Sequence, residues 1–265
     1  MVSLRLFVQL ISCVLLIFST ICAEERFLLV DGASRKIVFQ LGSQFDEQMS
    51  PCSTFKIPLS LMGYDAEILK DEEMPVWDCQ EGYDDYLETW KTPQSPHSWM
   101  RYSCVWYSKL LSCHLGLKKM QDYLDAFDYG NQVMRAEPVM PGKEDPAWFP
   151  SAPLKISVNE QIDFICKLVQ KKLPVTNHAL EMTKAILFNE ELPQEWKLFG
   201  KTGYSGSIGR EDPTILEYSW FVGWVEKDAH CFACAYLIRD KKIALDKRIP
   251  RVKELLSNTL TGEQR

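Results

Sequence analysis

A serine and a lysine three positions apart, Ser53 and Lys56, begin an apolar stretch that reads SPCSTFKIPLSLMGYDAEIL from residue 50 to residue 69. On a helix such residues share one face, so the hydroxyl and the amine can lie within hydrogen-bonding distance. Burial among Phe55 and the apolar residues that follow lowers the pKa of a lysine and makes its neutral amine accessible. A neutral amine is a base that can activate a serine nucleophile. The alternative is a helix capped by Ser53 with a solvated lysine one turn later, and this motif alone favours that alternative.

Two later segments change the balance between these interpretations. Lys201, Thr202 and Gly203 (K-T-G) stand at the end of a predicted strand, where the glycine allows the backbone of a ligand to approach closely. S-x-x-K followed much later by K-T-G is a combination found in penicillin-recognising serine enzymes. Ser103 and Val105 form an S-x-V motif between two predicted helices. Together the segments indicate acyl transfer to a serine.

In this order the motifs resemble those of the class D β-lactamases, the oxacillinase family. The family pattern of S-T-F-K, S-x-V, Y-G-N and K-T-G is present with agreeing spacing over nearly the whole mature chain. Two longer strings, PCSTFKIPLSLMGYDAEIL and WFVGWVEK, resemble the nucleophile helix of the family and the strand that follows K-T-G. Taken singly, the Y-G-N motif is a turn after a helix, and a purely structural role stays open for its residues, Tyr129, Gly130 and Asn131.

The resemblance implies a serine β-lactamase that hydrolyses penicillins. Ser53 attacks the β-lactam carbonyl and forms an acyl-enzyme, while Lys56 is modified by CO2 to N6-carboxylysine, the general base for acylation and deacylation. Ser103 relays a proton toward the lactam nitrogen, assisted by Lys201, whose charge also attracts the substrate carboxylate. The implied partners are β-lactam antibiotics, and no metal or cofactor is implied apart from CO2 or bicarbonate.

The same resemblance assigns residues that bind the substrate and shield the modified lysine. Thr202, next to Gly203, hydrogen-bonds the substrate carboxylate. The backbone N–H groups of Ser53 and Tyr204 form the oxyanion hole. Val105 forms an apolar wall over the modified lysine, and its alternative role is ordinary packing.

The family also holds the modified lysine with a tryptophan, and Trp148 in DPAWFPSAPLKIS is the candidate. Here the sequence departs from the family pattern, because the interval from Trp148 to Leu154 is one residue longer. Phe149 takes the ungapped position. If Trp148 does not reach the modified lysine, turnover becomes weak or biphasic.

A second departure concerns the arginine that binds the substrate carboxylate at the start of the last helix. The strict family position is Asp246 in this chain. Lys247, Arg248 and Arg251 are the possible substitutes, and Arg248 is preferred. The alternative is that all three lie on a solvated helix face.

Two other functions use the same kind of domain. A β-lactam sensor is acylated at its serine but is not deacylated, and such sensors usually follow several membrane helices. A cell-wall transpeptidase or carboxypeptidase generally has asparagine where this chain has Val105. This chain has one short N-terminal apolar segment and a valine at position 105. Both features favour the free enzyme.

The elements that must position these motifs predict an α+β fold of the α/β sandwich type. Short β-rich runs occur near residues 26–32 and 36–42 and again from about residue 196 to residue 239, with helical patterns between them and a last helix over about 242–260. We expect one antiparallel sheet built from both termini, flanked by helices, with a second and mostly helical lobe. Residues 24–265 then form one penicillin-recognising domain, in which 24–60 and about 175–265 make the sheet lobe and about 61–174 the helical lobe.

The N-terminal segment and the charge bound the location and the partners. Residues 1–23 have one basic residue, Arg5, an apolar run and small residues up to Ala23, which is typical of a cleaved signal peptide. Cleavage predicts a periplasmic or secreted bacterial protein, monomeric or homodimeric, without stable membrane insertion; a retained anchor is the alternative. The whole chain has a formal charge of −6, and loss of Arg5 makes it more acidic. Nucleic acid is therefore a poor partner.

The cysteines and histidines predict neither a metal site nor a complete set of disulfides. The chain has 9 cysteines, and removal of Cys13 and Cys22 leaves an odd number, so at least one thiol stays free or pairs between chains. Cys231 and Cys234 have C-x-x-C spacing, but in a strand residues three apart point to opposite faces. Cys52 and Cys104 are each adjacent to a predicted catalytic serine. We expect no disulfide between them.

Overall fold

The structure, a computed structural model, describes residues 23–134, 137–143, 145–206 and 216–260. The signal peptide predicted over 1–23 lies outside these residues except for Ala23. Within the described residues, none of the helices combines the length and hydropathy that a membrane span requires.

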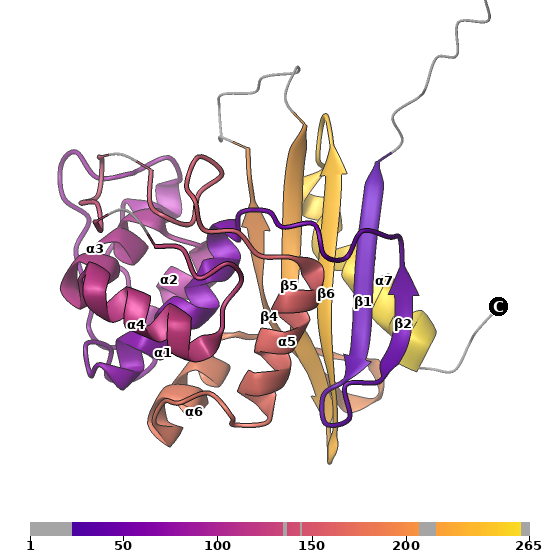
Figure 1. Cartoon of the computed structure of the whole chain (residues 1–265). Coiled ribbons are helices and arrows are strands. Elements are labelled where there is room, and N and C mark those ends of the chain that lie inside the picture. The colour runs from indigo at the N-terminus through magenta and orange to yellow at the C-terminus, as the bar shows by residue number, and fades with distance from the viewer. Residues whose placement is uncertain (1–22, 135–136, 144, 207–215, 261–265) are drawn as a thin grey trace, which may run out of the picture.

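One antiparallel sheet of six strands forms the centre of the molecule, in the order β2-β1-β6-β5-β4-β3 (Figure 1). Strands from the first part of the chain pair directly with strands from the last part, as the sequence predicts. The strands are β1 (Glu24–Asp31), β2 (Ile37–Leu41), β3 (Phe188–Leu192), β4 (Trp196–Tyr204), β5 (Glu217–Lys227) and β6 (His230–Asp240).

Both faces of the sheet are covered, which explains why the middle portions of its central strands carry consecutive apolar residues. In β1, Phe27 and Leu29 belong to one hydrophobic cluster, whereas Leu28 and Val30 belong to the other. Successive side chains of a strand point to opposite faces, so both clusters need apolar residues from the same strand. The edge strand β2 has only one neighbour, and Ile37 is 60% exposed.

Helices form a layer on each face of the sheet and a separate lobe beside it (Figure 1). The C-terminal helix α7 packs on one face, α5 packs on the other, and α1 packs against α6 and α3. The longer helices are α1 (Lys56–Asp65), α2 (Pro96–Tyr102), α3 (Val105–Leu115), α4 (Leu117–Phe127), α5 (Val158–Val169), α6 (Asn177–Ile186) and α7 (Arg248–Leu260). The 3-10 turns are η1 (Cys52–Phe55), η2 (Glu88–Trp90), η3 (Pro193–Glu195) and η4 (Leu245–Lys247).

Element boundaries differ from the predictions at three places. Ser53 does not cap a helix: it lies inside η1, and α1 begins only at Lys56 without a side-chain cap. The last helix begins at Arg248 rather than near residue 242, because η4 precedes it. Strand β3 was not predicted, since its sequence FNEEL carries charged residues at an edge of the sheet.

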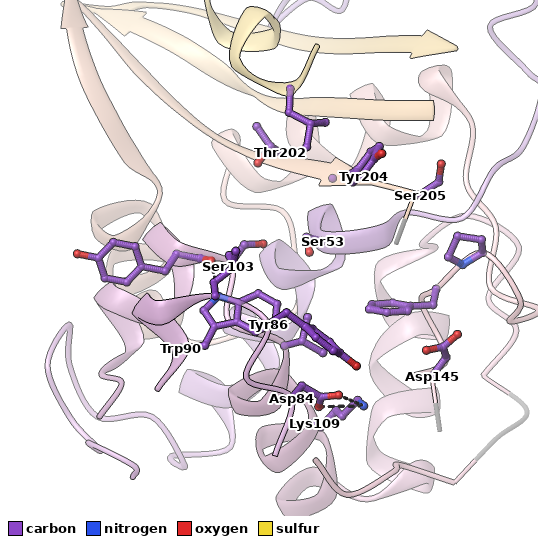
Figure 2. Close-up of a pocket in the computed structure, with 18 of the residues that line it drawn as sticks. Ser53, Asp84, Tyr86, Trp90, Ser103, Lys109, Asp145, Thr202, Tyr204 and Ser205 are labelled. Atoms are coloured by element: carbon purple, nitrogen blue, oxygen red, sulfur yellow. Dashed lines mark hydrogen bonds and ion pairs between the residues drawn. The ribbon is translucent and has the colours of Figure 1, made fainter. Parts of the chain in front are cut away.

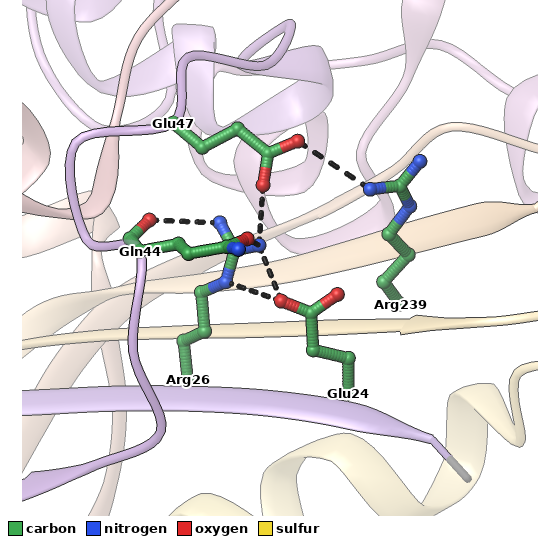
Figure 3. A network of polar contacts seen from close by, with 5 residues as sticks. All are labelled: Glu24, Arg26, Gln44, Glu47 and Arg239. Carbon is green, nitrogen blue, oxygen red and sulfur yellow. Dashed lines mark hydrogen bonds and ion pairs between the residues drawn. The ribbon is translucent and has the colours of Figure 1, made fainter. Parts of the chain in front are cut away.

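A buried arginine joins the start of the sheet to the segment that leads to Ser53. Arg26 is 1% exposed and forms ion pairs with Glu24 and Glu47, and its guanidinium donates to the Gln44 carbonyl at 3.0 Å (Figure 3). Glu47 also pairs with Arg239 of β6. Because a buried guanidinium must be paired, the 44–47 segment is held against β1 and β6.

The cysteines among the described residues, including Cys52 and Cys104, have free thiols. Cys234 belongs to the cluster under α7, while Cys231 packs against the cluster on the other face of the sheet. The prediction that these two side chains point to opposite faces is confirmed.

Candidate active site

Ser53 lies where the helical lobe meets the sheet, in the turn η1 that packs against β4. Gly203 of β4 permits this contact, because a Cβ at that position would lie 2.9 Å from the Pro51 carbonyl oxygen and 3.2 Å from Thr54 Cγ2. Any larger residue would push the strand and the turn apart. The glycine of K-T-G thus brings the strand beside the serine.

Lys56, the first residue of α1, is 1% exposed. Its Nζ has no hydrogen-bond partner among the described residues. Burial lowers the pKa of Lys56 to about 8, and the nearby Cys104 thiol opposes this shift to a smaller extent. The apolar environment expected from the sequence is therefore present, and it favours a neutral amine near Ser53.

Ser103 ends α2 in a left-handed conformation with φ of 58°. This turn reverses the chain, so α3 begins two residues later at Val105, which is 8% exposed. Ser103 and Val105 line the same cavity as Ser53.

The K-T-G segment closes the opposite side of the site. Thr202, Gly203 and Tyr204 line the cavity, and Lys201 is 5% exposed. Lys201 Nζ donates to the carbonyl and the hydroxyl of Thr202 at 3.1 and 3.3 Å. Burial and then the positive charges of Lys56 and Arg248 hold the pKa of Lys201 well below its ordinary value.

Arg248 is the basic residue that reaches the cavity from the start of α7. Its NH1 donates to the Gly203 carbonyl at 3.0 Å and to Ser219 Oγ at 2.8 Å, and burial lowers the pKa of Arg248 to about 10. By contrast, Lys247 is 76% exposed and Arg251 pairs with Glu25. Of the three basic candidates, only Arg248 lines the cavity.

Trp148 lies behind η1 rather than in the cavity wall. It is 2% exposed, its ring stacks on that of Phe55, and its carbonyl accepts from Ser50 Oγ at 2.5 Å and from the Cys52 N–H at 3.0 Å. Its indole Nε1 is buried without a partner among the described residues. Phe149 lines the cavity instead, so the longer interval leaves Trp148 in the interior.

The Y-G-N motif does not line the cavity. Gly130 has φ of 55°, and a Cβ there would lie 2.2 Å from the Lys155 carbonyl oxygen. The Asn131 side chain donates to the Pro153 carbonyl at 2.8 Å and accepts from the Lys155 N–H at 3.1 Å, while Tyr129 is fully buried. These contacts favour the structural role, which is to hold the segment that follows Trp148.

Of the motif residues, Ser53, Ser103, Val105 and the segment 202–204 line one cavity of about 720 Å³ (Figure 2), whereas Lys56 and Lys201 are buried beside it and are not among its lining residues. Much of its wall comes from residues that no motif indicated. They lie on the segment before α2, at the end of α2, on α3 and on the segment after residue 144, and include Asp84, Tyr86, Leu87, Trp90, Tyr102, Lys109, Asp145, Phe149, Pro150 and Ser151. Of these, Phe149 is the residue at the ungapped family position, and Lys109, a lysine within an apolar helical pattern, gave a signal that could have been used.

Among the described residues no group of three or more His, Cys, Asp or Glu side chains is placed to hold a metal ion. The hydroxyls of Ser53 and Ser103 and the guanidinium of Arg248 line the cavity, and Lys56 and Lys201 are buried.

Comparison with known proteins agrees with this arrangement. The family described as the penicillin binding protein transpeptidase domain matches residues 27–258. The β-lactamase OXA-1 of Escherichia coli is 37% identical over 210 residues, which cover 78% of this chain and 73% of that protein. The β-lactamase OXA-9 of Klebsiella pneumoniae is 32% identical over 206 residues, covering 76% and 74%.

Solved structures give the same result. The crystal structure of the OXA-427 class D β-lactamase superposes with a TM-score of 0.75 at 35% identity, covering 89% of this chain and 99% of that one. The class D β-lactamase FUS-1 (OXA-85) of Fusobacterium nucleatum subsp. polymorphum gives a TM-score of 0.76 at 28% identity, covering 89% and 92%. The chain therefore belongs to the class D β-lactamases, hydrolases with the penicillin-binding transpeptidase fold.

Proposed function

We propose that this β-lactamase hydrolyses penicillins through an acyl-enzyme on Ser53, with carboxylated Lys56 as the general base. One observation carries the proposal: two buried nitrogens, Lys56 Nζ and Trp148 Nε1, have no partner among the described residues. An unpaired buried polar group costs about 1–3 kcal/mol. A carbamate on Lys56 converts the amine into an anionic acceptor for such a donor.

The environment of Lys56 fits this modification. Only a neutral amine reacts with CO2, and burial lowers the pKa of Lys56 to about 8. Val105 adds an apolar wall at the start of α3 and excludes water without supplying a competing hydrogen bond. When attached to Lys56, the CO2 unit supplies an anionic base for the Ser53 proton and for the deacylating water.

The remaining residues act on the substrate. The backbone N–H groups of Ser53 and Tyr204 polarise the lactam carbonyl as an oxyanion hole. Ser103 carries a proton to the lactam nitrogen, and Lys201 assists this proton transfer. Thr202 and Arg248 bind the substrate carboxylate, which supports penicillins as substrates because every penicillin carries this group.

Secretion fits this function, since β-lactams act outside the cytoplasm. We propose that residues 1–23 are a cleaved signal peptide and that the mature domain, residues 24–265, works in the periplasm or outside the cell. The sheet lobe and the helical lobe are proposed as parts of that one domain. N-terminal sequencing of the secreted protein tests the cleavage at Ala23.

A mass and turnover experiment tests the mechanism. Mature protein is mixed with benzylpenicillin, with and without bicarbonate, and covalent mass and substrate loss are followed together. We expect turnover that rises with bicarbonate, no acylation in Ser53→Ala, and in Lys56→Ala slow acylation with almost no deacylation. Stoichiometric acylation without turnover would instead indicate a β-lactam sensor, and unchanged turnover in either variant would refute the assigned roles.

A further inference from the structure

Asp84 and Lys109 form a buried ion pair in the wall of the active-site cavity. Lys109 Nζ lies 3.0 Å from Asp84 Oδ2 and 3.2 Å from Oδ1. The two side chains are 5% and 2% exposed, and both residues line the cavity. Neither residue belongs to a motif of the proposed mechanism.

Contacts with a third segment hold the pair in place. Lys109 Nζ also lies 3.4 Å from the Lys143 carbonyl oxygen, and Asp84 Oδ2 accepts from the Gly142 N–H at 3.0 Å. Gly142 has φ of 72°, and a Cβ there would lie 1.6 Å from the Gly82 carbonyl oxygen. The pair therefore joins α3 to two loops in close contact, and its charges have defined positions facing the cavity.

The pair and the carboxylate-binding residues lie on opposite sides of the nucleophile. Figure 2 shows Ser53 between Thr202 on the sheet side and the Asp84–Lys109 pair on the helical side. In a penicillin the carboxylate and the acylamino side chain extend from opposite sides of the lactam ring. If Thr202 and Arg248 bind the carboxylate, the acyl side chain points toward the pair.

We propose that the Asp84–Lys109 pair determines which acyl side chains the enzyme accepts, by presenting a polar wall without net charge. The inference rests on the proposed function, which sets the direction of the substrate. The two side chains are almost fully buried, and the apolar residues Leu87 and Trp90 also line the cavity, so water screens a charge left without its partner poorly. Asp145 also lines the cavity but is exposed, and solvent reduces its influence.

Three penicillins with the same nucleus and phenyl ring test this inference. On the carbon next to the side-chain amide, ampicillin carries an ammonium, benzylpenicillin a hydrogen and carbenicillin a carboxylate. The variants Asp84→Asn and Lys109→Gln each remove one charge and keep groups that can form hydrogen bonds. The quantity measured is kcat/KM with bicarbonate, slightly below neutral pH, where the ammonium is protonated.

The two variants are expected to shift selectivity in opposite directions. Lys109→Gln leaves a carboxylate in the wall and raises the ratio of kcat/KM for ampicillin over carbenicillin about tenfold. Asp84→Asn leaves an ammonium and lowers that ratio about tenfold. The double variant carries neither charge and keeps the wild-type ratio within about twofold. Benzylpenicillin, which has no side-chain charge, reports any general loss of activity.

A purely structural pair gives a different result, because disrupting it affects all three substrates alike. Lys167→Gln and Asp128→Asn are charge-removing controls: these residues form a more exposed ion pair at 3.1 Å outside the cavity, and neither change is expected to alter the ratio. Thermal unfolding identifies any variant that fails to fold. One folded single variant is enough to test the inference, because each is expected to shift the ratio in its own direction.

The remaining outcomes separate the two proposals. If both single variants hydrolyse the penicillins with unchanged ratios of kcat/KM, the inference fails while the proposed function stands. If wild-type protein is neither acylated by nor active on any of the three penicillins, the proposed function fails, and the inference fails with it.

Discussion

The indole ring of Trp148 stacks on the ring of Phe55, with 5.0 Å between the ring centroids and 17° between the planes. Phe55 directly precedes Lys56, so a loop distant in sequence packs against the start of the helix that carries the lysine. Phe149 and Pro150 line the cavity. The additional residue is thus accommodated without moving Trp148 out of the interior.

Replacing Trp148 with Phe keeps a ring that can stack on Phe55 but removes the indole N–H. We expect hydrolysis at ambient CO2 to fall roughly tenfold or more, and saturating bicarbonate to restore most of it, because a hydrogen bond to a charged group contributes about 1.5–3 kcal/mol. Initial rates across a bicarbonate titration measure the effect. Phe149→Leu, a change in the cavity wall, serves as the control. An identical bicarbonate requirement in Trp148→Phe and wild type would contradict the assignment.

The stability of the uncarboxylated protein depends on pH through Lys56. Burial lowers the pKa of Lys56 from 10.5 to about 8, so between these values the unfolded chain binds more protons than the folded one. Stability from this group therefore rises as the pH increases from about 8 to about 10.5, by on the order of 3 kcal/mol, and below that range the full penalty is present. Denaturant unfolding in CO2-free buffer measures it. Lys56→Met should lack this rise. Parallel curves of stability against pH for the variant and wild type would exclude the contribution of Lys56.

Arg248→Ala removes the basic residue that lines the cavity where we propose the substrate carboxylate to bind. We expect KM for benzylpenicillin to rise about tenfold to a hundredfold with a smaller change in kcat, since hydrogen bonds to a charged group contribute about 1.5–3 kcal/mol. Steady-state kinetics separate the two constants. Arg251→Ala is the control, because Arg251 pairs with Glu25 away from the cavity. Equal effects of the two variants would show that Arg248 does not bind the substrate.

Gly203→Ala adds a methyl group that would lie 2.9 Å from the Pro51 carbonyl oxygen. We expect β4 and η1 to separate slightly, with a loss of stability of about 1–3 kcal/mol and a larger loss in the acylation rate, because the proposed oxyanion hole spans the two elements. Stopped-flow acylation and thermal unfolding on the same sample compare the two effects. Wild-type acylation in a folded Gly203→Ala protein would argue against this geometry.

Asn131→Ala tests whether the Y-G-N motif is structural. The variant loses the side-chain hydrogen bonds to Pro153 and Lys155, so we expect a stability loss of about 1–3 kcal/mol. At low temperature, where the protein stays folded, kcat/KM is expected to remain within about threefold of wild type. A large loss of activity with unchanged stability would assign Asn131 to the chemistry instead.

The sheet and the motif residues could be predicted because their signals are local. Apolar runs such as FLLV in β1 are typical of strands that are buried on both faces, and S-x-x-K and K-T-G carry their spacing in the sequence itself. Strand β3 was not predicted because it lies at an edge of the sheet, where its charged residues hide the apolar pattern of a buried strand. Ser53 was taken as a cap because the sequence cannot distinguish a capped α-helix from a 3-10 turn that precedes one.

The cavity wall could not be predicted because it depends on contacts between distant segments. Lys109 in an apolar helix indicates a buried charge, but its partner Asp84 lies in a loop without periodicity. The sequence already favours Arg248 over Arg251, but the position of Arg248 in the cavity wall depends on where α7 begins, after η4. Such long-range geometry appears only once the fold is formed.

The pairing of β1 with β6 also determines when the enzyme can become active. β1 is made at the start of the chain and β6 near its end, so the middle of the sheet closes only after almost the whole polypeptide has been synthesised. A fold dominated by pairings between distant segments forms slowly. If the chain is exported as proposed, slow closure of the sheet gives it time to cross the membrane unfolded, and Ser53 then meets β4 only after translocation.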